Sequence, residues 1–153
     1  MIRLSLNREP VTVTLRPPLA DIELTLRRLT TVDFNEADQA ARKLCDDSGK
    51  LAELMAEHGL LPEGNSLKAW KKMRDSDPLT YAAALTGVRM WVASVECAVR
   101  GVLSWKGVGD VNGNAVPVSR SALESLMLVN DFSMQVMAQL DQAAQLIILE
   151  GKP

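Results

Sequence analysis

The chain of 153 residues is poor in the side chains that form disulfides, metal sites and aromatic cores. It has 2 cysteines, 1 histidine and 4% aromatic residues. Cys45 and Cys97 form neither a disulfide framework nor a zinc-binding pattern, which favours a reducing compartment. The single histidine, His58, excludes metal sites that need several histidines. Because aromatic residues are so few, the core of the protein must be mainly aliphatic.

A strong net charge is also absent. With 17 Lys+Arg and 19 Asp+Glu, the formal charge is -2, without the basic excess that is typical of nucleic-acid-binding proteins. At 47% hydrophobic and 24% charged residues, the chain is too apolar and too balanced for intrinsic disorder. Its length favours a single domain over residues 1–153. We therefore expect one soluble intracellular domain whose composition does not identify its partner.

The charges are unevenly distributed. Residues 1–76 carry 12 basic and 12 acidic side chains, whereas residues 77–153 carry 5 and 7. The longest apolar stretch, residues 81–105, is long enough to span a bilayer, but three charged side chains interrupt it. We therefore expect this stretch to be a buried helix and not a membrane span.

Alternation of apolar and polar residues predicts three strands near the N-terminus, over residues 2–6, 11–15 and 22–26. A polar turn at residues 7–10 separates the first two. We expect an antiparallel β-meander within residues 1–30, with one apolar face that the remainder of the chain must cover.

Helical spacing of apolar residues prevails from residue 31 onward. The clearest start is Asp77 followed by Pro78, which predicts an N-cap and a proline in the first turn. They open a long central helix that reaches Trp105, is rich in small residues and is expected to be mostly buried. The other expected helices cover residues 33–58 (continuous but weakened at Gly49), 66–74, 121–129 and 132–150. The predicted fold class is therefore α+β, predominantly α-helical, with an N-terminal three-stranded antiparallel β-meander followed by a bundle of about five helices around a long central helix.

The last expected helix has an unusual outward face. It carries Gln, Met and Ala where a solvated helix usually carries Lys and Glu, and Asp141 is its one clear charge in mid-helix. Such a face suits contact with another protein, while an uncharged surface or packing within the domain is the alternative interpretation. The residues expected to bind a partner here are Met134, Ala138, Gln142, Gln145 and Leu149.

Patterns for catalytic, cofactor-binding or metal-binding sites are incomplete. Residues 107–109 contain two glycines, but they follow a helix and lack the third glycine of a phosphate-binding loop. Residues 110–114 are similar to the start of a calcium loop, but Ala115 and Ser121 replace the required glycine and glutamate. The basic cluster at residues 68–74 could contact nucleic acid, but acidic residues follow directly, which favours a solvated helix face. We therefore expect no enzymatic activity, metal or cofactor.

The segment from Trp105 to Ser119 resembles a loop of the tail assembly chaperones of long-tailed, non-contractile bacteriophages and related prophages. Many of these proteins carry the pattern W-x-G-V-x-D-x-x-G-x-x-x-P after a long helix, followed by one or two short helices. The crossover at residues 29–34 into an acidic, Ala-rich helix is also similar, so the resemblance touches most of the chain. We expect Trp105 to anchor the loop on the core. The residues that match the motif, as structural or partner-binding positions, are Trp105, Val108, Asp110, Gly113 and Pro117.

The resemblance implies a small, non-enzymatic protein in the cytoplasm of the bacterial host. Such a protein would bind the tape-measure protein and recruit tail-tube subunits during tail assembly. Tape-measure proteins are long and apolar, and they would aggregate if left uncovered. We expect neither nucleic acid nor a membrane as partner, while self-association stays open.

Two other functions are compatible with the same sequence. A small structural tail or adaptor protein of the phage particle could have this composition, and it would be retained in purified particles in fixed copy number. A DNA-binding regulator could use residues 68–74, and its binding to DNA would depend on salt. Unlike a structural tail protein, a tail assembly chaperone would be absent from mature particles.

Overall fold

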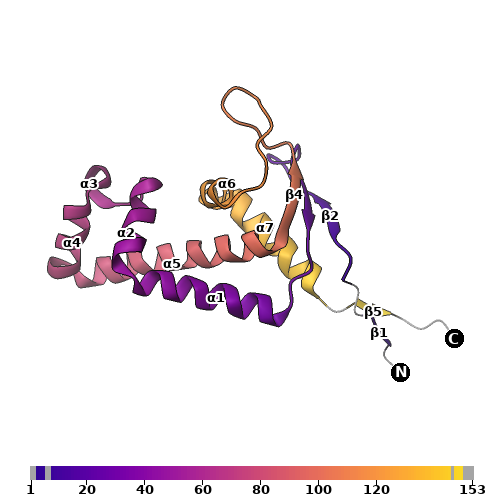
Figure 1. Ribbon diagram of the computed structural model, residues 1–153, viewed down its shortest axis with the longest axis horizontal. Coiled ribbons are helices and arrows are strands. Elements are labelled where there is room, and N and C mark those ends of the chain that lie inside the picture. The colour runs from indigo at the N-terminus through magenta and orange to yellow at the C-terminus, as the bar shows by residue number, and fades with distance from the viewer. Residues whose placement is uncertain (1–2, 6–7, 146, 150–153) are drawn as a thin grey trace.

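The computed structural model describes residues 3–5, 8–145 and 147–149 (Figure 1). The predicted fold class is confirmed, because helices dominate and accompany a three-stranded antiparallel sheet and one long central helix. Figure 1 shows the sheet toward one end of the molecule and α2 (Ser48–Glu57), α3 (Pro62–Asn65) and α4 (Leu67–Ser76) at the other, with the central helix between them. The two ends are therefore joined by α1 (Thr31–Asp46) and the central helix, which run side by side.

The three-stranded sheet has the order β2 (Val11–Thr14), β3 (Glu23–Leu26), β4 (Val102–Lys106), and all neighbours are antiparallel. β2 and β3 confirm two of the predicted strands. The predicted first strand, over residues 2–6, is not part of this sheet, and β4, for which the sequence predicts helix, takes its place. β1 (Arg3–Ser5) pairs instead with β5 (Ile147–Leu149) in a separate two-stranded sheet.

The burial of β3 gives a physical reason for this arrangement. Leu24 and Leu26 are completely buried, and β4 places Trp105 and Val102 opposite them. A helix continuing to Trp105 would leave this side of β3 without a hydrogen-bonding neighbour in the core. The chain becomes extended directly after Gly101, whose carbonyl accepts a hydrogen bond of 2.7 Å from the backbone N–H of Arg27.

The central helix α5 (Pro78–Gly101) begins as predicted, with the Asp77 side chain accepting a hydrogen bond from the backbone of Thr80. Only its C-terminal half is mostly buried, which corrects the expectation of a mostly buried helix. In the N-terminal half Leu79 is 85% exposed, and Met90, at the middle of the helix, is 69% exposed. By length and composition alone α5 could cross a membrane, but the core helix of a soluble protein has the same properties.

The predicted helix over residues 33–58 is two helices, α1 (Thr31–Asp46) and α2 (Ser48–Glu57). Thr30 caps α1, in a capping box with Asp33. Asp47 interrupts the helix with extended backbone, and its side chain accepts a hydrogen bond from Lys50 as the N-cap of α2. The helical spacing of apolar residues continues across this break, so that spacing alone does not imply a continuous helix.

A link, α3 (Pro62–Asn65), leads to α4 (Leu67–Ser76), which is capped by Ser66 and confirms the predicted helix around Trp70. Trp70 joins α2 and α5 in a small apolar cluster that is distinct from the main core. Its fully enclosed members, together with this tryptophan, are Leu51, Met55 and Leu61.

The C-terminal region contains α6 (Arg120–Leu126) and α7 (Asn130–Ala144). α6 is capped by Ser119, and Val129 occupies the N-cap position of α7 without a side-chain hydrogen bond. The predicted extension of the last helix to residue 150 is wrong, because α7 ends at Ala144 and β5 follows. The main core lies between the sheet, α1, the second half of α5, α6 and α7, with fully buried members that include Leu24, Leu26, Ala37, Phe132, Val136 and Leu140.

Candidate functional site

An uncharged groove of about 580 Å³ lies between the second half of α5, the turn after α6 and the start of α7. Its lining contains three of the seven methionines of the chain and no Asp, Glu, Lys or Arg. A fourth methionine, Met134, is 63% exposed and accepts a weak hydrogen bond from the groove residue Asn130 at 3.4 Å. The groove is lined by Met90, Trp91, Ala93, Ser94, Cys97, Met127, Leu128, Asn130, Ser133 and Met137.

Helical spacing and two tertiary contacts form this groove. Positions three and four apart on α5 and on α7 place the lining side chains on one face of each helix. The indole of Trp91 donates a hydrogen bond of 3.1 Å to the carbonyl of Glu124, which ties α6 to α5. Gly101 lies against Leu140, so α7 approaches the end of α5 closely. The walls therefore belong to elements that the core holds in place.

The chemistry of the groove is that of non-covalent binding. Burial raises the pKa of the Cys97 thiol, which makes this cysteine a poor nucleophile at neutral pH. Methionine side chains are flexible and polarisable, so they adapt to apolar partners of different shapes. The groove therefore suits an apolar segment better than a charged one.

The predicted partner-binding residues of the last helix divide into two groups. Met134, Ala138, Gln142 and Gln145 are exposed, and the first three share one side of α7. Met134 lies beside the groove, while the others continue along the helix away from it. Leu149 does not share this face, because it lies in β5 and pairs with Arg3. The sequence therefore identified the uncharged face of α7, but not the groove beside it.

The predicted loop follows β4 and is hairpin-like, with an antiparallel bridge between Gly109 and Ala115 (Figure 1). The indole of Trp105 donates a hydrogen bond of 2.6 Å to the carbonyl of Val116, and its half-buried ring packs on the main core. Val108 also packs on the core. These contacts give Trp105 and Val108 a structural role as anchors of the loop.

The outer part of the loop is shaped by its own backbone. Asp110 accepts hydrogen bonds of 2.9 Å from the backbones of Asn112 and Asn114, which lower its pKa. Gly113 has a φ of 79°, a conformation that favours glycine. Pro117 is exposed near the end of the loop. Asp110 and Gly113 thus fix the turn itself.

The expected site residues do not include two further residues of the loop, Gly107 and Val111. Gly107 has a φ of 82°, and a Cβ added there would lie 2.0 Å from the carbonyl oxygen of Asp21. Val111, at the tip, is 101% exposed. A positive φ is not readable from sequence, although an exposed valine within a polar turn is a visible signal.

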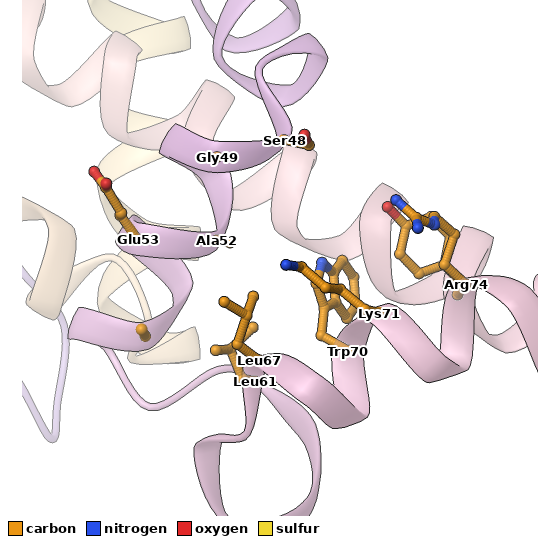
Figure 2. A pocket seen from close by; sticks show the side chains of 11 residues that line it. Ser48, Gly49, Ala52, Glu53, Leu61, Leu67, Trp70, Lys71 and Arg74 are labelled. Carbon is orange, nitrogen blue, oxygen red and sulfur yellow. The ribbon is translucent and has the colours of Figure 1, made fainter.

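A second pocket, of about 400 Å³, opens between α2, α4 and the start of α5 (Figure 2). Its interior is mainly apolar, and charged side chains stand at its edge. It includes Lys71 and Arg74 from the predicted basic cluster. The pocket is lined by Ser48, Gly49, Ala52, Glu53, Ala56, Leu61, Leu67, Trp70, Lys71, Arg74 and Tyr81.

Buried charges in the helical region form structural contacts. Glu96 receives hydrogen bonds from Arg100 and Arg120 and so joins α5 to α6. His58 lies 3.7 Å from the carboxylate of Glu124 and contacts the ring of Trp91 at its edge. Across the part of the chain that the structure describes, no three His, Cys, Asp or Glu residues are grouped as a metal site would require.

Comparison with known proteins adds no relative: no protein-family model, curated protein or solved structure matches the chain. Two depressions of the described surface, the methionine-rich groove and the pocket between α2 and α4, have mainly apolar linings and volumes of about 580 and 400 Å³. The larger one, the methionine-rich groove, is continuous with the face that the sequence predicts to bind a partner. This groove and Met134 therefore form the candidate functional site.

Proposed function

We propose that this protein is a tail assembly chaperone of a long-tailed, non-contractile bacteriophage or prophage. In this role it binds the tape-measure protein non-catalytically in the bacterial cytoplasm and recruits tail-tube subunits. The proposal rests on the methionine-rich groove, whose lining has no charged side chain. Exposed apolar surfaces of this kind are typical of binding sites for other proteins.

The nature of the client explains why such a groove is useful. A long apolar protein presents many segments that are similar in polarity and different in shape. Met90, Met127 and Met137 can change rotamers to fit such segments, and no fixed ion pair has to be matched. The likeness of residues 105–119 to the family loop supports the same function independently of the groove.

Co-expression with a tape-measure protein encoded in the same phage or prophage genome tests the proposal. We expect the client to stay soluble and to co-purify with this chain. The double variant Met90→Asp/Met134→Asp places two charges at exposed positions of the candidate site, and we expect it to lose the client. Neither co-purification nor a gain in client solubility with the unaltered chain would contradict the proposal.

Leu79→Asp is the matched control for these substitutions. Leu79 is exposed on the same helix, but it does not line the groove. This variant should retain the client, and equal losses in both variants would remove the groove from the proposal. Mass spectrometry of purified particles then separates a chaperone, which is absent from them, from a structural tail or adaptor protein, which is present in fixed copy number.

A further inference from the structure

The pocket between α2 and α4 has rigid apolar walls on one side and very short side chains on the other. Leu61 and Trp70 are buried, and the ring of Trp70 lies 4.5 Å from the ring of Tyr81 between centroids. Facing them, α2 contributes four small residues, so the walls leave about 400 Å³ between them, within the usual range for ligand pockets. These small residues are Ser48, Gly49, Ala52 and Ala56.

The link between α2 and α4 holds the two walls apart. Glu63, Gly64 and Asn65 all have left-handed backbone, with φ of 48°, 72° and 65°. The Asn65 side chain fixes this conformation: its amide donates to the carbonyl of Ala56 at 2.8 Å, and its oxygen accepts from the backbone of Leu61 at 3.2 Å. The end of α2 and the pocket wall are thus positioned by the same side chain.

Charge is placed asymmetrically around the opening. Lys71 and Arg74 border it on α4, and Glu53 borders it on α2. Figure 2 shows the Lys71 side chain extending along Trp70 toward α2. Arg74 already contacts Asp75 at 3.3 Å, while none of the ion pairs among the described residues includes Lys71. The α4 edge therefore attracts a carboxylate, and the α2 edge disfavours a second one.

We propose that this pocket binds a peptide segment of a partner protein in which a bulky apolar side chain stands next to an acidic residue. The apolar side chain lies between α2 and α4 against Trp70, and the neighbouring carboxylate pairs with Lys71 and Arg74. This site is separate from the methionine-rich groove, and the proposal does not depend on a role in tail assembly. A nucleic acid fits less well, because its phosphates would use the two cations and leave the apolar interior empty.

NMR titration of the full ¹⁵N-labelled chain tests the site with two short capped peptides. One contains phenylalanine followed by aspartate, and in the other lysine replaces the aspartate. The acidic peptide should shift the amide signals of Gly49, Ala52 and Lys71. At low salt it should bind about tenfold more tightly than the lysine peptide, because two favourable ion pairs become two repulsions.

Two charge-reversed variants decide whether the effect belongs to the pocket. Lys71→Glu/Arg74→Glu should abolish the preference for the acidic peptide. Lys68→Glu/Lys72→Glu makes the same change in net charge on the same helix, at positions that do not line the pocket, and should change the preference less than twofold. All four positions are exposed, so we expect both variants to fold, which circular dichroism verifies.

Three results would overturn the proposal: no shifts around the pocket, equal affinity for the two peptides, or equal loss in the two variants. None of them bears on client binding, because the co-expression test uses substitutions in the groove. Conversely, loss of the client from the groove variants leaves the peptide titration unaffected. The two proposals can therefore fail separately.

Discussion

Arg120 donates a hydrogen bond of 2.6 Å to the carboxylate of Glu96, across 24 positions of sequence. Arg100, one turn further along α5, donates a second bond of 2.6 Å to the other carboxylate oxygen. Burial acts to raise the pKa of Glu96, but these two hydrogen bonds outweigh it, so the pKa lies below its usual value. A buried negative charge thus fastens α6, which borders the groove, to the central helix.

Arg120→Ala should therefore destabilise the protein. The substitution removes one of two charged partners from a carboxylate that is mostly shielded from water, which costs about 1–3 kcal/mol. Arg42→Ala, which removes an exposed ion pair with Asp38, should change stability by less than about 0.5 kcal/mol. Urea unfolding at pH 7 measures both, and equal effects would show that the buried contact contributes no more than an exposed one.

The capping box of α1 predicts a dependence on pH. The Arg27 guanidinium donates hydrogen bonds of 2.9 and 3.1 Å to Asp33, and together with bonds from Thr30 it holds the pKa of that carboxyl well below its usual range. A lowered pKa in the folded state stabilises the protein above the unfolded pKa of about 3.9, and this contribution is lost as the pH falls further.

Asp33→Asn should accordingly reduce stability at pH 7 and flatten the fall in stability between about pH 5 and pH 2. Unfolding free energies at several pH values measure the difference between variant and parent. That difference should shrink as the pH falls. A difference that stays constant down to pH 2 would contradict the assignment of the charged contact to Asp33.

The sequence predicts those parts of the fold that local signals determine. Asp77 and Pro78 mark the start of α5, and alternation marks β2 and β3, because each signal acts within a few residues. β4 depends on a partner strand far earlier in the chain, and its residues directly follow an apolar helix that ends at Gly101. Local periodicity therefore could not distinguish strand from helix there.

The candidate site was predictable to a similar extent. The absence of charge on the last helix identifies Met134 as a surface residue that suits a partner, and the structure places it beside the groove. The groove itself arises where α5 meets α7, so it depends on the relative position of two helices. Met90 lies on α5 and Met137 on α7, and these helices are in close contact where Gly101 meets Leu140.

The two glycines of α5 should respond oppositely to alanine. A Cβ at Gly101 would lie 2.4 Å from Cδ2 of the fully buried Leu140, so Gly101→Ala should destabilise the protein by about 1–3 kcal/mol. A Cβ at Gly87 meets nothing within 4 Å, so Gly87→Ala should stabilise it by about 0.5–1 kcal/mol through helix propensity. Thermal and urea unfolding measure both changes. Similar shifts in the two variants would contradict close packing of α7 on α5.

We expect the base of the loop after β4 to be important for the stability of the protein, and its tip to be unimportant for it. Gly107→Ala places a methyl group 2.0 Å from the carbonyl oxygen of Asp21 in a left-handed conformation, so we expect a loss of about 2 kcal/mol or more. Val111→Ser changes a side chain that is 101% exposed, and stability should stay within about 0.5 kcal/mol.

Urea unfolding measures these stabilities. Loss of the client in the co-expression assay is then interpreted differently for the two variants. Loss of the client in Gly107→Ala can follow from a displaced loop alone, whereas loss in the stable Val111→Ser would assign a direct contact to the tip. If Val111→Ser destabilises the chain as much as Gly107→Ala, the tip must pack against the protein, and its exposure in the isolated chain does not describe its role. If only Gly107→Ala is unstable and both retain the client, the family-like loop supports the fold next to Trp105, and client binding rests on the methionine-rich groove.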